Sequence, residues 1–111
     1  MFLGEDVPAV DAAEVPADAY LLDVREQDEW IAGHAPEAVH IPMRDLGDRA
    51  AEIPRDREVF VICRSGGRSA QVTVALNQAG WLARNVAGGM QRWAQAGRPM
   101  DSELGGPPQV V

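Results

Sequence analysis

The chain has 111 residues, which is enough for one domain with a modest hydrophobic core. Its formal net charge is −7, and this acidic balance argues against nucleic acid or an anionic membrane as a partner. No segment has the pattern of a signal peptide or the apolar length of a membrane span, and one cysteine cannot form an internal disulfide. We therefore expect a cytoplasmic protein with a free thiol.

Short apolar runs alternate with helix-like segments along the chain. Strands are expected over residues 7–10, 20–24, 38–41, 58–62 and 84–87. Helices are expected after Asp11 and over residues 28–31, 45–52, 69–79 and 89–96. The helix over 69–79 has the clearest signal, because apolar residues recur along it at helical spacing and Gly80 follows where a terminating glycine is expected.

This alternation predicts a single-domain α/β fold with a five-stranded, mostly parallel sheet and helices on both faces. The domain should span residues 7–99. Residues 1–6 should form a flexible N-terminus, and residues 100–111, which are rich in proline and glycine, should form a poorly ordered tail. Asp23 and Cys63 each stand at the carboxyl end of an expected strand, so we expect both at the edge where sites form in such sheets.

The chain's single cysteine follows the apolar run Val59–Ile62 and precedes the helix over 69–79. A lone cysteine is usually a buried, inert side chain. A thiol at a helix N-terminus, however, feels the positive end of the helix dipole and lies close to unpaired N–H groups. Such surroundings lower a cysteine pKa from about 8.5 to roughly 3.5–7.5. The position of Cys63 therefore favours a reactive thiolate.

The residues that follow Cys63 strengthen this interpretation. Arg64 and Arg68 add positive charge, and Ser69 can donate a hydroxyl or cap the helix. Gly66 and Gly67 lack a Cβ, so the backbone can turn and direct several N–H groups inward as an anion nest. Such a loop suits two cargoes, a persulfide on the sulfur or a tetrahedral oxyanion under attack.

The loop Cys63-Arg64-Ser65-Gly66-Gly67-Arg68-Ser69 resembles the active-site loop of the rhodanese superfamily of sulfurtransferases. The likeness extends over residues 7–99 through several motifs in the right order, namely Asp23-Val24-Arg25, Gly33-His34-Ala35-Pro36, Gly80-Trp81, Gly88-Gly89, Trp93 and Gly97-Arg98-Pro99. Three positions depart from the family's pattern, Ala35, Glu37 and His40. All three lie outside the cysteine loop. Ala35 and Glu37 flank Pro36 and question the turn geometry, and His40 is expected to alter a hydrogen bond there.

The resemblance implies a thiosulfate sulfurtransferase that works through a Cys63 persulfide, with a small-molecule sulfur donor and a thiophilic acceptor, cyanide or a thiol, which a partner protein can also carry. It implies no metal and no organic cofactor. Cys63 would be the nucleophile, and the expected substrate-binding residues are Arg64, Ser65, Gly66, Gly67, Arg68 and Ser69. The two arginines favour an anionic donor. We also expect a monomer, because no exposed apolar stripe stands out.

Three alternatives stay open at this stage. A non-catalytic regulatory binding module usually lacks the cysteine, which this chain keeps, whereas a persulfide carrier that holds sulfur for a partner would keep the same loop. A cysteine-dependent phosphatase or an arsenate reductase is less well matched, because the related phosphatases have a loop one residue longer. Their arginine would fall at Ser69, whereas Arg68 closes a six-residue loop. An arsenate reductase often needs a second cysteine, which this chain lacks.

The remaining polar candidates are expected to support structure. Asp23 and Arg25 should flank the site without acting as acid or base. Asp23 should either accept hydrogen bonds from loop N–H groups or pair with an arginine of the cysteine loop. His34 is expected to order its own loop. The three tryptophans should fill the core or its edge.

Overall fold

The computed structural model describes residues 7–111, so the expected flexible N-terminus over residues 1–6 lies outside the described residues. Five strands form one sheet in the order β1-β5-β4-β2-β3, namely β1 (Ala9–Asp11), β2 (Tyr20–Asp23), β3 (Val39–His40), β4 (Glu58–Ile62) and β5 (Leu82–Ala87). Every neighbouring pair is parallel. The predicted α/β fold is thus confirmed, with a sheet that is parallel throughout.

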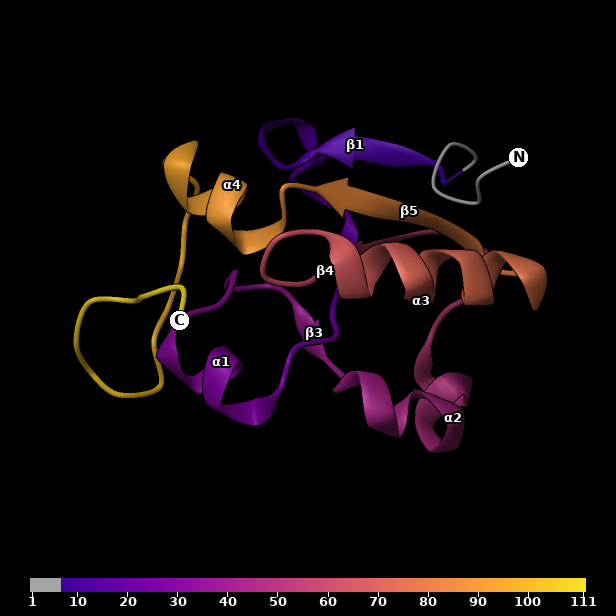
Figure 1. The fold of residues 1–111 in the computed structure, drawn as a ribbon, viewed down its shortest axis with the longest axis horizontal. Coiled ribbons are helices and arrows are strands. Elements are labelled where there is room, and N and C mark those ends of the chain that lie inside the picture. Colours follow the sequence, from indigo (N-terminus) through magenta and orange to yellow (C-terminus); the bar gives the residue numbers. More distant parts are fainter. Residues whose placement is uncertain (1–6) are drawn as a thin grey trace.

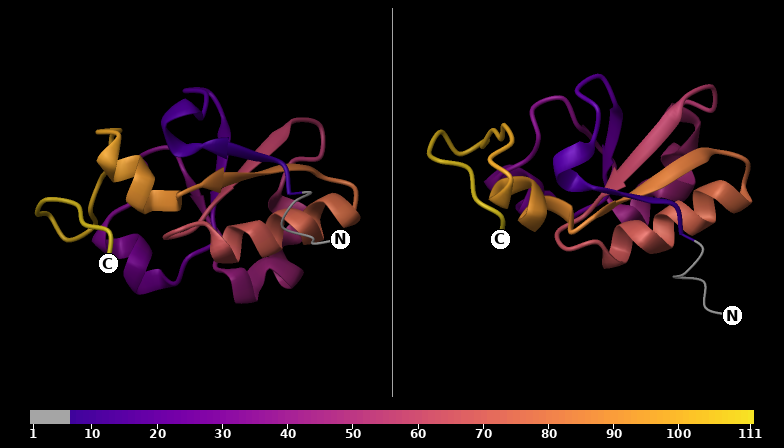
Figure 2. Two further views of the ribbon diagram at one scale, coloured as in Figure 1. Left: turned by 45° about the horizontal axis from the view of Figure 1, so that its top comes forward. Right: turned by 90° about the horizontal axis from the view of Figure 1, so that it is seen from above.

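Three α-helices connect successive strands and a fourth follows the last strand (Figure 1). The connecting helices are α1 (Gln27–Ala32), α2 (Leu46–Arg49) and α3 (Gly67–Gln78), and the last helix is α4 (Gly89–Gln95). The two further views in Figure 2 show helices on both sides of the sheet. Alternate residues of the strands explain this layering, since Leu22 and Val61 pack with Leu76 of α3, while Leu21 and Phe60 pack in the cluster that contains Trp93 of α4.

Two helices differ most from their predicted bounds. The expected helix over 45–52 is split into a 3-10 turn, the four-residue α2 and a second 3-10 turn. Gly47 lies inside this segment, where its low helix propensity weakens the helix. The helix predicted from residue 69 begins at Gly67 instead, because Gly66 takes a left-handed conformation with φ of 112° and starts it there.

The chain after α4 returns to lie beside α1 (Figure 1). His34 and Asp101 exchange two backbone hydrogen bonds of 2.9 and 2.8 Å. Farther along, the N–H of Glu103 donates to the carbonyl of Ile31 at 3.0 Å, and that of Gln109 donates to the carbonyl of Ala32 at 2.8 Å. These bonds connect the C-terminal segment to α1 and to His34 just after it. That residues 100–111 form a poorly ordered tail in solution stays a prediction. Among residues 7–111, no helix is long and apolar enough to cross a membrane.

Candidate active site

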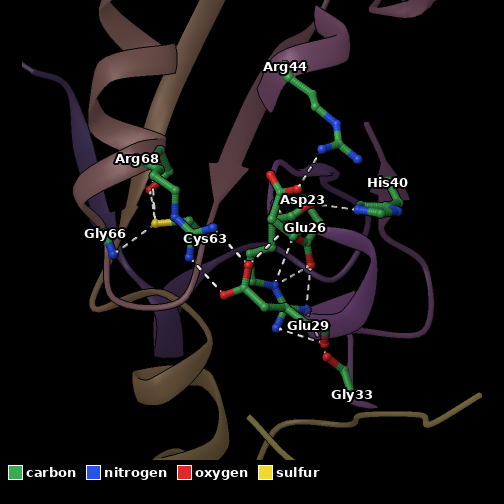
Figure 3. Close-up of polar contacts among 11 residues, drawn as sticks. Asp23, Glu26, Glu29, Gly33, His40, Arg44, Cys63, Gly66 and Arg68 are labelled. Carbon is green, nitrogen blue, oxygen red and sulfur yellow. Dashed lines mark hydrogen bonds and ion pairs between the residues drawn. The ribbon is translucent and has the colours of Figure 1, made fainter. Parts of the chain in front are cut away.

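The carboxyl ends of β2 and β4 meet at one edge of the sheet. Asp23 pairs in register with Ile62, the residue that precedes Cys63. The structure therefore brings Asp23 and the cysteine loop together, as the order of the strands along the sequence predicts. Figure 3 shows this edge with Cys63, Asp23 and the arginines around them.

The sulfur of Cys63 is surrounded by hydrogen-bond donors. The side chain is buried with 1% of its surface exposed. The backbone N–H of Gly66 lies 3.1 Å from Sγ (Figure 3). The backbone N–H of Ser69 lies 3.4 Å from Sγ, and its hydroxyl oxygen lies 3.2 Å away. These donors all point at one atom, so the loop is suited to a negative charge on that sulfur.

Burial and hydrogen bonding act on the thiol in opposite directions. Burial raises the pKa of Cys63, because a thiolate is poorly solvated inside the protein. Donation from the Ser69 hydroxyl and from the backbone N–H groups of Ser69, Gly66 and Ser65 lowers it. The hydrogen bonds outweigh the burial, and the pKa of Cys63 lies below its ordinary value. A larger share of the protein thus carries a nucleophilic thiolate near neutral pH.

Helix α4 holds the carbonyl side of the same loop. The N–H of Met90 donates to the carbonyl of Cys63 at 2.8 Å, and that of Gln91 donates to the carbonyl of Arg64 at 3.0 Å. Gly89 allows this approach, since a Cβ there would lie 2.5 Å from the Cys63 carbonyl oxygen and its φ of 57° is left-handed. These bonds fix the loop's carbonyls toward α4, while the loop's N–H groups face the sulfur.

The two arginines of the loop differ in their surroundings. Arg68 donates from both terminal nitrogens to the two carboxylate oxygens of Glu29, each at 2.8 Å. These bonds raise the pKa of Arg68 and lower that of Glu29, so both stay charged and largely neutralise each other. Arg64 and Ser65 are exposed, and Arg64 forms no ion pair with any of residues 7–111.

Asp23 and Arg25 form a fully buried ion pair beside the loop. The Asp23 carboxylate accepts bonds from Nη2 and Nε of Arg25 at 2.8 and 2.9 Å and from the Arg25 backbone N–H at 3.1 Å. The alternative in which Asp23 pairs with an arginine of the cysteine loop is therefore wrong. Asp23 and Arg25 lie two positions apart at the end of β2, and Arg25 already forms a bidentate pair with the Asp23 carboxylate.

Arg25 also fixes α1 in place. Its Nη2 donates to the carbonyl of Gly33 at 2.8 Å, and its Nη1 donates to the carbonyl of Glu29 at 3.3 Å. Because α1 carries Glu29, the buried Asp23–Arg25 pair holds the helix whose carboxylate binds Arg68. Arg25 therefore reaches the cysteine loop through another residue and does not contact Cys63 itself.

The histidines hold loops, as expected for His34. Nδ1 of His34 lies 2.8 Å from the Trp30 carbonyl, and Nε2 of His40 lies 2.8 Å from the Arg25 carbonyl. Both rings stack on Trp30, at centroid distances of 3.6 and 4.7 Å. Trp81 and Trp93 are buried. Among residues 7–111, no group of three or more metal-ligating side chains is present.

Three residues at the site were not singled out from the sequence as part of it: Glu29, Asn85 and Gly89. Asn85 carries the clearest missed signal, since this polar residue shares the buried side of β5 with Ala83, whereas Arg84 between them is exposed. Its side chain is buried and its Oδ1 lies 2.6 Å from the Ser69 hydroxyl oxygen. A polar side chain at such a position needs a partner, and the partner is the cysteine loop.

Comparison with known proteins supports one family. The model of the Rhodanese-like domain family matches residues 9–96. The chain is 41% identical over 86 residues to a Bacillus subtilis (strain 168) protein named "Putative sulfurtransferase YtwF", covering 78% of this chain and 84% of that protein. It is 40% identical over 84 residues to a protein of Allochromatium vinosum named "Sulfurtransferase", covering 75% and 78%.

A solved structure agrees with the sequence relatives. The rhodanese-related protein of Thermoplasma volcanium superposes with a TM-score of 0.80 at 33% identity. The match covers 85% of this chain and 97% of that one. The domain described above is therefore similar to a complete rhodanese-related chain.

Proposed function

The chain belongs to the rhodanese-like domain family, and we propose that it is a thiosulfate sulfurtransferase that works through a persulfide on Cys63. It would take sulfane sulfur from thiosulfate or another anionic donor and pass it to cyanide or a thiol. Sulfurtransferase is the activity named for its relatives in Bacillus subtilis and Allochromatium vinosum.

The first step forms the persulfide. The Cys63 thiolate attacks the outer sulfur of thiosulfate, a new S–S bond forms, and the S–S bond of thiosulfate breaks. The electron pair of the thiolate becomes the new bond, sulfite leaves with the pair of the broken bond, and the outer sulfur keeps its negative charge in Cys63–S–S⁻. The N–H groups of Gly66 and Ser69 and the Ser69 hydroxyl are aimed at the reacting sulfur, where they stabilise the attacking anion.

The second step releases the sulfur. Cyanide attacks the outer sulfur, the persulfide S–S bond breaks, and thiocyanate leaves while the electron pair returns to Cys63 as thiolate. A thiolate acceptor takes the sulfur in the same way and becomes a persulfide. Because donor and acceptor react in turn with one sulfur, the expected kinetics are ping-pong.

The observation that carries this proposal is the set of donors on Sγ from a six-residue loop. At the position where the related phosphatases have their arginine, Ser69 brings a backbone N–H and a hydroxyl within 3.4 and 3.2 Å of the sulfur. The expected roles of Arg64 and Arg68 in attracting the donor are part of the proposal. Since Glu29 neutralises Arg68, exposed Arg64 would supply most of the attraction.

A second candidate function is a persulfide carrier that delivers sulfur to a partner protein. One relative, 38% identical over 74 residues, is named a sulfur carrier protein, and the match spans 40% of its length. The Glu29–Arg68 pair favours this candidate, because it reduces the positive charge next to the sulfur and hence the attraction for a small dianion.

The test is to incubate the protein with thiosulfate, measure its intact mass, and then add cyanide. We expect one added sulfur on the wild type and its loss when cyanide is added. One equivalent of thiocyanate should form in that step, and thiocyanate should form catalytically when thiosulfate and cyanide are both in excess. Cys63→Ser should take up no sulfur, and its circular dichroism and thermal unfolding show whether it is folded. The comparison is clean because Cys63 is the single thiol of the chain.

Each other outcome changes the assignment. A persulfide that forms and persists in cyanide without turnover contradicts the enzyme and supports the carrier. Absence of both sulfur uptake and thiocyanate rejects both candidates. Hydrolysis of an aryl phosphate that depends on Cys63 contradicts the proposal in favour of a phosphatase.

A further inference from the structure

The hydroxyl group of Ser69 has one hydrogen and two acceptors. Its oxygen lies 3.2 Å from Cys63 Sγ and 2.6 Å from Asn85 Oδ1. A hydroxyl can donate only one hydrogen at a time, so it cannot serve both acceptors together. The choice between them decides how many donors the sulfur has.

The orientation of the Asn85 amide follows from its second contact. Its Nδ2 lies 3.3 Å from the carbonyl oxygen of Gly66, and this oxygen can only accept. The amide nitrogen therefore faces Gly66, and Oδ1 faces Ser69. Asn85 lies on β5 with 8% of its surface exposed, so its side chain is largely shielded from solvent.

We propose that Asn85 is a positioning residue that competes with Cys63 for the single hydroxyl hydrogen of Ser69. When Cys63 is a neutral thiol, the hydroxyl donates to Asn85. When the thiolate forms, the charged sulfur is the stronger acceptor, and the hydrogen turns to it. After sulfur transfer the charge is on the outer sulfur, and the hydrogen returns to Asn85.

This competition sets the balance between thiol and thiolate. Asn85 stabilises the thiol form by accepting the hydrogen, so it opposes ionisation of Cys63 even though its own side chain is neutral. The charged groups at this edge lie on other elements: Arg68 on α3 with its partner Glu29 on α1, the Asp23–Arg25 pair at the end of β2, and exposed Arg64. None of them forms a hydrogen bond with the Asn85 side chain, so substitutions at residue 85 leave their charges in place.

The inference rests on the proposed function because it concerns the same nucleophile, but its test needs no sulfur donor. The thiolate fraction of the purified protein is followed against pH by absorbance and by the alkylation rate with iodoacetamide. In Asn85→Leu the hydroxyl has only the sulfur as acceptor, so the Cys63 pKa falls and the alkylation rate below that pKa rises about threefold to tenfold. In Asn85→Asp the carboxylate keeps the hydrogen, and the rate falls.

Both substitutions remove the bond to Gly66, and Asn85→Asp also adds a negative charge near the sulfur, which by itself raises the pKa of Cys63. The fall of the Cys63 pKa in Asn85→Leu, and its dependence on Ser69, therefore separate this role from a structural one. In a Ser69→Ala background, the effect of Asn85→Leu should disappear. Asn77→Leu is the matched control, since Asn77 also bonds backbone through its amide, at Ala83, away from the cysteine loop.

An unchanged or raised pKa in a folded Asn85→Leu variant overturns the inference, as does an effect that persists in the Ser69→Ala background. A protein that shows the predicted pKa shifts but takes up no sulfur from thiosulfate contradicts the proposed function and leaves the inference standing. A protein that transfers sulfur but lacks these pKa shifts supports the proposed function and overturns the inference.

Discussion

Two neighbouring strands, β2 and β4, end at the same edge of the sheet in different ways. After β2, the Asp23 carboxylate is fully buried and is bonded by the guanidinium and the N–H of Arg25. After β4, the Cys63 sulfur faces two backbone N–H groups and a hydroxyl that it shares with Asn85. The Asp23 carboxylate has a permanent partner, whereas the cysteine loop stabilises a charge that is present only when Cys63 is a thiolate. The first arrangement provides structure, and the second suits the chemistry that we propose for Cys63.

The two strand ends are connected through α1. Arg25 bonds the carbonyls of Glu29 and Gly33, and the Glu29 carboxylate bonds Arg68 in the helix that follows the cysteine loop. The C-terminal segment bonds α1 from its other end. The permanent pair and this segment therefore set where Glu29 lies, and Glu29 sets the charge beside the sulfur.

The largest effect should come from breaking the permanent pair. Arg25→Met leaves the buried Asp23 carboxylate without its partner, which should lower the free energy of unfolding by about 3–5 kcal/mol. Urea denaturation followed by circular dichroism measures it. The double variant Asp23→Leu/Arg25→Met removes both charges and should regain part of the loss. If Arg25→Met is as stable as the wild type, the pair is not a structural anchor.

A smaller effect should come from the C-terminal side of α1. A Cβ on Gly33 would lie 2.5 Å from the carbonyl oxygen of Gln109, so Gly33→Ala should displace this segment and cost about 1–3 kcal/mol. Its φ of 175° is extended, so the backbone itself tolerates alanine. Gly47→Ala is the matched control, because nothing lies within 4 Å of its Cβ.

Hydrogen exchange of residues 27–33 reports on the same contact. We expect faster exchange in Gly33→Ala than in Gly47→Ala. If the segment over 100–111 is poorly ordered in solution, as its composition predicts, Gly33→Ala will keep the stability of the wild type and its exchange over residues 27–33. That result would remove the C-terminal segment from the set of elements that hold α1.

The sequence predicted the parallel sheet and the cysteine loop because both depend on local patterns. Apolar runs such as Val59–Ile62 identify buried strands, and the glycines and arginines after Cys63 identify an anion loop. The partners of these groups could not be predicted in the same way. Glu29 lies 39 positions from Arg68, and Asn85 lies 16 positions from Ser69, so their contacts depend on how the elements pack.

The pairing of Asp23 shows why proximity at an edge is not enough. The carboxyl ends of β2 and β4 do lie together, yet the carboxylate bonds an arginine two positions away instead of one in the cysteine loop. A residue two positions away needs no tertiary packing to be near. The sequence contains both possibilities, and the buried bidentate geometry of Arg25 decides between them.

The smallest effect should come from the charge of Glu29. Glu29→Gln leaves Arg68 charged but no longer neutralised, so a negatively charged reagent should reach Cys63 more readily. We expect the ratio of the alkylation rates with iodoacetate and iodoacetamide to rise about threefold at low salt, since the two reagents differ mainly in charge.

Glu52→Gln is the control for this measurement, because it removes the same charge from an exposed pair with Arg49 at a distance from the cysteine loop. Its rate ratio should stay at the wild-type value, and the rise in Glu29→Gln should shrink as salt is added. An unchanged ratio in Glu29→Gln would mean that Arg68 exerts no net force on an anion at the sulfur. The donor's charge would then be recognised by Arg64 and the loop's own N–H groups, and the comparison between the two strand ends would reduce to their backbone geometry.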